Sequence, residues 1–306
     1  MHIPRRWDKI LDIDSCDIMP SVGSKIVNFV RDLSKNSSLK PYDQKTHIGF
    51  LRYLMLRFGQ NTNELMVNIV TAYEDLDRLV PFVSQLTSEF SEITTVVNNI
   101  NTRKADVSFG EKEILLYGQP FLKEKLKNLT FQISSNSFFQ TNTHMAEKLY
   151  DVILDEVDSS SNEIAYDLYC GAGSISLFLA QKVKFVYAFD IIVSSIENAE
   201  ENAIYNKVKN VDFKVANLDT YFDNHRLSGR PKPDIVVVDP PRSGMHKKMT
   251  SFLPRLKAKK IIYVSCNPNT FLRDLNCLED YKVKSLAVFD QFSNTEHLEL
   301  IGILSR

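Results

Sequence analysis

Hydrophobic and polar positions follow a mixed pattern in the first part of the chain. Two apolar runs within residues 47–74 flank the turn-forming sequence GQNTN and predict two adjacent strands. Residues 74–90 repeat apolar positions at helical spacing around a proline, and residues 93–101 and 112–120 predict short strands. Residues 1–130 are therefore predicted to form a smaller α+β domain, without an evident catalytic motif.

A regular alternation of strands and helices begins further along the chain. The predicted strands are residues 163–169, 185–191, 211–217, 233–239, 259–265, 283–290 and 297–304. Predicted helices come before or between them at residues 144–157, 175–182, 193–207 and 270–275. Near-continuous apolar strands joined by helices indicate an α/β domain with a mostly parallel, doubly wound sheet. We assign this domain to residues 131–306.

Composition narrows the class of protein. The chain has 306 residues, 43% hydrophobic content and a net charge of −1. No apolar run is long enough for a membrane span, and the N-terminal sequence MHIPRRWDKI lacks the apolar centre of a signal peptide. We therefore expect a cytoplasmic protein without membrane contact, and a monomer. The near-neutral charge argues mildly against a dedicated nucleic-acid binder, although a local basic patch matters more than the total.

The sequence AYDLYCGAGSISLFLA predicts a strand, a glycine turn and a helix. Gly171 and Gly173 permit a tight turn and close approach of the backbone to a ligand. Asp190 ends the next strand, where a carboxylate can accept hydrogen bonds from a ribose diol. Ser176 stands where the dinucleotide fingerprint needs a third glycine, so S-adenosylmethionine (SAM) fits better than NAD. A tight turn without a ligand is the alternative.

The sequence PDIVVVDPPRSG places an acid directly after a very apolar strand. Burying Asp239 there without a partner would be costly, so it is expected to face a cleft. Pro240 and Pro241 stiffen the exit from the strand, and Gly244 bends it. Arg242 occupies the position where amino-group methyltransferases often carry an aromatic residue, which disfavours an amino-nitrogen target.

The sequence KKIIYVSCNPNT ends a predicted strand with a cysteine. Cys266 is either a reactive thiol or a small buried hydrophobic residue. A predicted helix at residues 270–275 would favour its thiolate through the positive end of the helix dipole. His297 and Glu299 are predicted to share one face of the last strand. Glu299 is then either a base tuned by burial or a residue of a solvent-facing edge.

Several motifs in this order resemble the RNA uracil-5 methyltransferase family. They are ISSNSFFQTN, DLYCGAGSISL, VVVDPPRSGMH, IIYVSCNPNTFLRDL and NTEHLELIGIL, with WDKILDIDSC, YDQKTHIGFLRYLMLR and ELMVNIVT upstream. The resemblance covers nearly the whole chain. It implies a Rossmann-like SAM-dependent methyltransferase domain that forms 5-methyluridine in structured RNA, either tRNA or ribosomal RNA.

The resemblance also implies roles for individual residues. The nucleophile would be Cys266, which adds to C6 of uracil, and the base that removes the C5 proton would be Glu299. The second-strand acid is usually Glu in the family, so Asp190 is a conservative departure. The cofactor site would comprise Gln140, Tyr169, Asp190, Asn217 and Asp239, beside the glycine turn of Gly171 and Gly173.

The N-terminal part departs from the family pattern. Members commonly begin with a small RNA-binding β-barrel, and some carry an iron–sulfur cluster held by four cysteines. Cys16 matches the fourth ligand, but the other three are absent from the sequence. We therefore expect no metal, and either a branch without N-terminal modules or a fragment of a longer protein.

Two competing functions stay open at this point. An RNA cytosine-5 methyltransferase would use the same covalent chemistry, but its usual Pro-Cys motif is replaced here by DPPR. A catalytically decayed RNA-binding module of the same fold is the other possibility. The presence of both Cys266 and Glu299 argues against decay.

Overall fold

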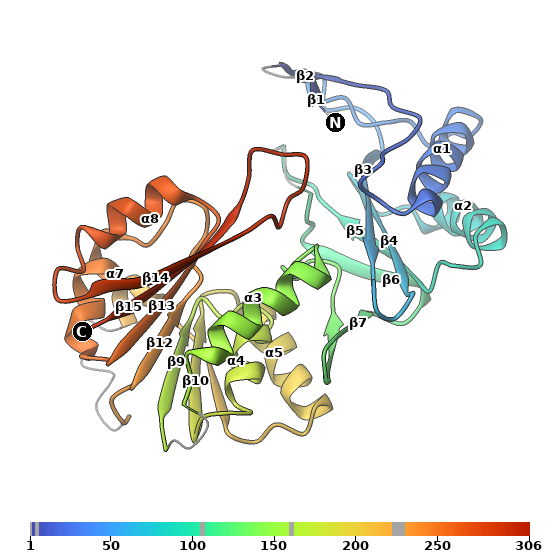
Figure 1. Ribbon diagram of the computed structural model, residues 1–306. Coiled ribbons are helices and arrows are strands. Elements are labelled where there is room, and N and C mark those ends of the chain that lie inside the picture. Colours follow the sequence, from blue (N-terminus) through green and yellow to red (C-terminus); the bar gives the residue numbers. More distant parts are fainter. Residues whose placement is uncertain (1, 4–5, 105–107, 159–161, 222–229) are drawn as a thin grey trace. The chain divides into compact units, whose positions relative to one another are not determined.

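The computed structural model describes residues 2–3, 6–104, 108–158, 162–221 and 230–306. The chain divides into two compact units (Figure 1). Unit 1 comprises Met1–Glu124 and Ser134–Asn136, and unit 2 comprises Lys125–Ile133 and Ser137–Arg306.

Unit 1 is built on a four-stranded sheet with the order β3-β4-β5-β6. The predicted pair of strands around GQNTN is confirmed, because β3 and β4 pair antiparallel, whereas β4 and β5 are parallel. Its elements are β1 (His2–Ile3), β2 (Arg6–Ile10), α1 (Ser21–Lys35), β3 (Leu51–Phe58), β4 (Leu65–Thr71), α2 (Leu76–Glu89), β5 (Thr95–Ile100) and β6 (Lys112–Gly118).

Apolar faces of α1 and α2 pack with β3, β4 and β5 to form the core of unit 1. Ile26, Leu79, Leu86, Val67 and Val96 are fully or almost fully buried in it. The sequence did not predict α1. This helix has neither a side-chain cap nor an acidic residue in its first turn, so the usual signals of a helix start are missing.

Unit 2 contains a seven-stranded sheet with the order β11-β10-β9-β12-β13-β15-β14. All neighbouring strands from β11 to β13 are parallel, and β15 is antiparallel to both of its neighbours. The prediction of a mostly parallel, doubly wound sheet is therefore confirmed. The strands are β9 (Ile164–Leu168), β10 (Phe185–Asp190), β11 (Val211–Val215), β12 (Ile235–Val238), β13 (Lys260–Ser265), β14 (Lys282–Phe289) and β15 (Glu299–Ser305).

Helices cover both faces of this sheet, with α3, α4 and α5 on one side and α7 and α8 on the other (Figure 1). The second side carries a continuous core in which Val238 and Tyr263 of the sheet pack with Met249, Leu253 and Phe271. The helices are α3 (Thr143–Asp155), α4 (Ser174–Leu179), α5 (Val193–Tyr205), α6 (Leu218–Tyr221), α7 (Lys247–Phe252), the 3₁₀ helix η1 (Leu253–Leu256) and α8 (Pro268–Leu275). A short ribbon of β7 (Leu122–Leu126) and β8 (Leu129–Ile133) precedes α3.

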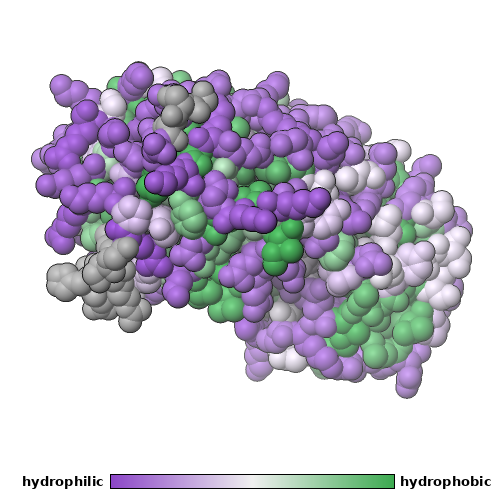
Figure 2. Space-filling model, turned by 90° about the horizontal axis from the view of Figure 1, so that it is seen from below, coloured by the Kyte–Doolittle hydropathy of each residue, from purple (hydrophilic) through white to green (hydrophobic). Residues whose placement is uncertain are grey.

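Hydrophilic side chains cover most of the surface seen from below in Figure 2, and hydrophobic residues gather there in separate patches. Within the described ranges, no helix combines the length and the apolar character that crossing a bilayer requires.

Candidate active site

The carboxyl ends of the parallel strands of unit 2 meet at one edge of the sheet. In register, Leu168 pairs with both Phe189 and Val238, so β9, β10 and β12 end at the same level. Because β15 runs antiparallel to β13, its first residues reach that edge, and Leu300 pairs with Ser265. The structure therefore brings Tyr169, Asp190, Asp239, Cys266 and Glu299, all adjacent to or within these strand ends, to one edge of the sheet.

The glycine turn after β9 has two glycines with different surroundings. Both lie in the left-handed region, with φ of +54° at Gly171 and +83° at Gly173. A Cβ at Gly173 would lie 2.9 Å from Cβ of Ala199, so this glycine allows α5 to pack closely. A Cβ at Gly171 would meet nothing within 4 Å. Gly171 therefore leaves open space beside the backbone, as close approach of a ligand requires.

Asp190 holds the turn in place through its carboxylate. One oxygen accepts a hydrogen bond from the backbone amide of Gly171, and the other accepts from the amide of Ile192, both at 2.9 Å. Each carboxylate oxygen retains a second lone pair, so Asp190 can still accept from a ribose hydroxyl.

Asp167, the fourth residue of β9, is fully buried with one oxygen lacking a partner. The hydroxyl of Ser176 donates to its Oδ2 at 2.5 Å, while no described residue bonds to Oδ1. Burial, followed by the nearby charges of Asp239 and Asp190, raises the pKa of Asp167 to about 7. The serine that breaks the dinucleotide fingerprint thus orients an acid whose second oxygen is available to a cationic donor.

Two further carboxyls at this edge carry raised pKa values. Burial alone raises the pKa of Asp239 to about 7. Glu299, which is 3% exposed, has a pKa raised to about 8 by burial and then by the charge of Asp239. Glu299 is therefore buried and not on a solvent-facing edge. Acids held close together in a desolvated site disfavour each other's ionised forms, so a bound cation would be stabilised among them.

Cys266 is half-buried and follows directly after β13. The predicted helix after it is confirmed as α8, but the net shift of the thiol pKa is upward. Burial raises the pKa of Cys266, and the charges of Glu299 and Asp239 raise it further, whereas Arg242 opposes them. In the free site, burial and then the neighbouring carboxyls therefore favour the protonated thiol.

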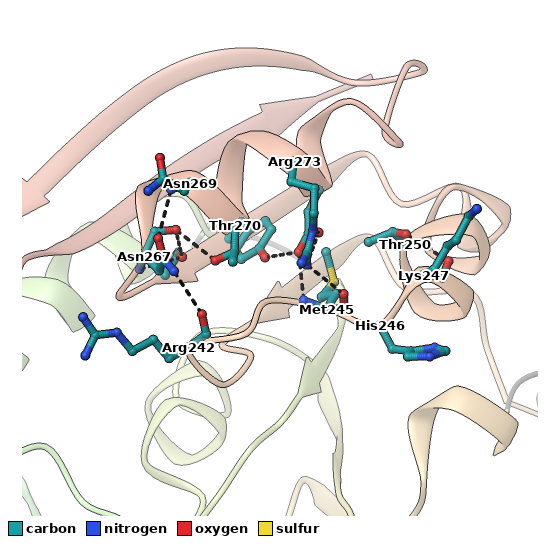
Figure 3. A network of polar contacts seen from close by, with 12 residues as sticks. Arg242, Met245, His246, Lys247, Thr250, Asn267, Asn269, Thr270 and Arg273 are labelled. Atoms are coloured by element: carbon teal, nitrogen blue, oxygen red, sulfur yellow. Dashed lines mark hydrogen bonds and ion pairs between the residues drawn. The ribbon is translucent and has the colours of Figure 1, made fainter. Parts of the chain in front are cut away.

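The loop after Cys266 is fixed by Asn267 (Figure 3). The side chain of Asn267 caps α8 by accepting from the amide of Asn269 at 3.0 Å, and its Nδ2 donates to the carbonyl oxygen of Arg242 at 3.2 Å. In Figure 3 the guanidinium of Arg242 points away from His246 and Lys247. Asn267 therefore ties the cysteine loop to the DPPR loop.

The expectation that His297 and Glu299 share a strand face is wrong, because β15 begins at Glu299. His297 lies before the strand, and the guanidinium of Arg242 donates to its Nδ1 at 2.8 Å. A guanidinium can only donate, so Nδ1 must accept. His297 therefore contacts Arg242 of the DPPR sequence through its side chain and does not share a strand face with Glu299.

Asp274 of α8 was not identified from the sequence, although it organises the DPPR loop. It is 2% exposed and accepts from the amide of Met245 at 2.8 Å and from the hydroxyl of Tyr263 at 2.6 Å. Arg273 pairs with it at 2.6 Å and donates to the carbonyl of Met245 (Figure 3). A Cβ at Gly244, whose φ is +76°, would lie 2.8 Å from Oδ2 of Asp274, so the bend needs glycine.

A cavity of about 700 Å³ opens at this end of unit 2, and its lining includes Tyr169 and Asn217. Ile191, Lys247 and Arg273 also line it. Cys266, Glu299, Asp239 and Gln140 are not among its lining residues. Of the predicted cofactor-binding residues, Tyr169 after β9 and Asn217 after β11 therefore line this cavity.

Gln140 lies in the segment before α3, and Oε1 of its side chain accepts from Nε2 of Gln291 at 3.0 Å. Gln291 belongs to the loop between β14 and β15 and gave no signal in the sequence. Across the part of the chain that the structure describes, no group of three or more His, Cys, Asp or Glu side chains is arranged to hold a metal ion.

Comparison with known proteins adds independent information. The family model described as tRNA (Uracil-5-)-methyltransferase matches residues 82–306. An uncharacterized RNA methyltransferase of Chlorobaculum tepidum is 38% identical over 100% of this chain and 64% of its own length. One from Oceanobacillus iheyensis is 36% identical over 95% of this chain and 64% of its own length. The chain thus spans about 64% of the length of these two curated relatives.

A solved structure agrees with these matches. The crystal structure of a Pyrococcus abyssi tRNA (uracil-54, C5)-methyltransferase in complex with S-adenosyl-L-homocysteine is 33% identical to this chain, with a TM-score of 0.83. The match covers 99% of this chain and 71% of that chain.

Proposed function

The chain belongs to the tRNA (uracil-5-)-methyltransferase family, and on this basis we propose that it methylates C5 of a uridine in structured RNA. The methyl donor in this proposal is SAM. One observation carries it: antiparallel β15 brings the buried carboxyl of Glu299 to the sheet edge at which β13 delivers Cys266. Those two side chains are what covalent methylation of uracil C5 requires.

We assign the nucleophilic step to Cys266 and the proton abstraction to Glu299. The thiolate adds to C6 of uracil, which makes C5 an enolate carbon able to attack a methyl group. When bound, SAM would supply that methyl group from its sulfonium and be left as the thioether S-adenosylhomocysteine. Glu299 then takes the C5 proton, the C5–C6 double bond forms again, and the thiolate leaves.

The charges around the two residues support this division of labour. Glu299, with a pKa of about 8, is mostly protonated at neutral pH, and the pKa of Cys266 is also raised. Both shifts arise from burial and neighbouring carboxylates, so positive charge bound nearby lowers both pKa values. We infer that cofactor binding favours both the thiolate and an ionised base.

A cofactor with cationic groups fits the residues at the sheet edge. Oδ1 of Asp167, buried and without a partner, and the carboxyl of Asp239 can receive an ammonium group. The open space beside Gly171 admits the ligand, and Asp190 can hold its ribose. Tyr169 and Asn217 would enclose the adenine in the cavity, and Gln140 would hold the amino-acid end.

The RNA partner is proposed at the level of its class. We propose tRNA or ribosomal RNA, with the target uridine flipped out of the stack to reach Cys266. The α+β region, residues 1–130, is assigned to RNA contact, and the protein is proposed to act as a cytoplasmic monomer.

The test uses RNA containing 5-fluorouridine together with SAM. Fluorine at C5 leaves no proton to remove, so the wild-type protein should remain covalently bound to the methylated RNA. Cys266→Ala should form no adduct, while Cys16→Ala, which changes a free cysteine of unit 1, should still form it. An adduct that survives Cys266→Ala would assign the nucleophile to another residue.

A second experiment tests Glu299 and the target base. Glu299→Gln should remain trapped on ordinary RNA because elimination needs the base, and clean turnover would remove Glu299 from that role. Mass mapping of the product from unmodified tRNA and ribosomal RNA should find methyluridine. Methylcytidine would identify a cytosine-5 enzyme, and RNA binding without any methyl transfer would identify a decayed module. Failure to bind SAM at millimolar concentration would contradict the proposal as a whole.

A further inference from the structure

A buried glutamine links the loop between β14 and β15 to the segment that carries Gln140. Gln291 is 2% exposed, and its Nε2 donates to Oε1 of Gln140 at 3.0 Å and to the backbone carbonyl oxygen of Asn142 at 3.4 Å. Nδ2 of Asn142 donates in turn to the carbonyl oxygen of Gln291 at 3.4 Å. The two segments are therefore joined by reciprocal contacts.

Packing alone does not account for a glutamine at position 291. Its Oε1 is buried and has no partner among the described residues. A buried amide oxygen without a hydrogen bond is unfavourable, and an apolar side chain of the same length would avoid it. What glutamine adds is its amide nitrogen, which both of its side-chain contacts use.

These contacts determine which way the carboxamide of Gln140 faces. The carbonyl oxygen of Asn142 can only accept, so the atom of Gln291 directed toward it must be the amide nitrogen. The same nitrogen faces Gln140, which must therefore present its oxygen to Gln291. The amide nitrogen of Gln140 is left for another partner, and the structure shows none for it among the described residues.

A free amide nitrogen selects the chemistry of its ligand. It can donate to a carboxylate but offers nothing to an ammonium group. At the same edge of the sheet, the acids Asp167 and Asp239 have the opposite preference. The two ends of an α-amino acid are thus distinguished by different residues.

We propose that Gln291 is a positioning residue that holds Gln140 with its amide nitrogen toward the α-carboxylate of SAM. The inference rests on the proposed function, because it concerns the cofactor of that reaction. It assigns Gln291 no contact with the ligand; its effect passes through Gln140.

The experiment compares two ligands in one set of proteins. Binding of S-adenosylhomocysteine and of its decarboxylated analogue is measured by calorimetry for the wild type, Gln291→Met, Gln140→Met and the double variant. Gln291→Met keeps the side-chain length and removes the amide. It should weaken S-adenosylhomocysteine about three- to tenfold, the usual effect of one hydrogen bond, and leave the affinity of the decarboxylated analogue unchanged.

The double variant tests whether Gln291 acts through Gln140. In the Gln140→Met background, Gln291→Met should cause no further loss. In turnover, Gln291→Met should raise KM for SAM while kcat and KM for RNA stay near the wild type. Gln291→Glu keeps the shape but reverses the preferred orientation of Gln140, so it should weaken S-adenosylhomocysteine more than methionine does.

The results distinguish failure of the proposed function from failure of the positioning role of Gln291. If the wild type binds neither ligand, the proposed function fails. If the wild type binds S-adenosylhomocysteine but Gln291→Met binds both ligands as the wild type does, the positioning role fails. Equal loss for both ligands, or additive loss in the double variant, also overturns it, because a general loss of structure does not distinguish a carboxylate.

Discussion

Replacing Glu299 with glutamine should stabilise the folded protein, and increasingly so as the pH rises. The pKa of Glu299 is raised from an ordinary 4.5 to about 8. Between these pH values the folded state retains a proton that the unfolded state has released. The wild-type free energy of unfolding therefore falls as pH rises through this window and stays low above it. Glutamine does not titrate, so the variant lacks this loss.

The size of the effect follows from the difference between the two pKa values. If Glu299 titrated alone, that difference would correspond to about 5 kcal/mol of lost stability above pH 8. Asp239 has a pKa of about 7 and contributes to the shift of Glu299. Because the two carboxyls titrate as a coupled pair, we expect the advantage of Glu299→Gln to grow by about 2–4 kcal/mol between pH 5 and pH 8.5.

The assay is urea unfolding at both pH values, followed by circular dichroism and by hydrogen exchange of the β13 and β15 amides, which reports on unit 2 alone. Only the change with pH is interpreted, since the constant cost of burying a carboxamide cancels. Glu296→Gln, at an exposed position three residues before β15, is the matched control and should show no such change. An advantage of Glu299→Gln that is equal at pH 5 and pH 8.5 would refute the reasoning.

The remaining predictions concern the glycine turn, the thiol and the DPPR loop. Gly171→Ala should cost about 1–2 kcal/mol of stability, because its backbone is left-handed, and should abolish most binding of S-adenosylhomocysteine. Gly173→Ala should lower the melting temperature further, because its methyl group meets α5. A lower melting temperature for Gly171→Ala than for Gly173→Ala in thermal scans would contradict the two roles. Alkylation of Cys266 by iodoacetamide at pH 8.5 should be faster in Glu299→Gln than in the wild type, since the glutamate charge raises the thiol pKa. Equal alkylation rates of the two proteins, measured by mass spectrometry, would show that the charge of Glu299 does not affect the thiol. Asp274→Asn should destabilise unit 2 by about 1–3 kcal/mol in urea, because a buried carboxylate accepting from an amide and a tyrosine hydroxyl is replaced; a neutral result would show that the loop does not depend on it.

Local sequence patterns were sufficient for the parts of the fold that depend on local physics. Apolar runs of strand length, separated by helical segments, predicted the parallel sheet of unit 2, and the glycine turn predicted the β9–α4 connection. Position after a strand also placed Asp190, Asp239 and Cys266 at one edge, because the carboxyl ends of parallel strands meet there. None of these conclusions requires knowing which strands are neighbours.

The signals failed where the determining contact is distant in sequence. The bond from Gln291 to Gln140 joins residues 151 positions apart, and the bridge from Arg242 to His297 spans 55. Neither pair has a periodicity or a spacing that marks it. The start of β15 was also placed two residues early, since nothing local separates His297 from the strand.

By itself the sequence determined the chemical types at the site and the strand ends that carry them, because both follow from residue identity and hydrophobic period. Only the tertiary structure decided that β15 enters antiparallel between β13 and β14, so that Glu299 comes to the edge that holds Cys266. The tertiary structure also decided the protonation states of Cys266 and Glu299. A pKa depends on burial and on charges brought near in space, and the direction for Cys266 is opposite to the one that its neighbouring helix alone predicts.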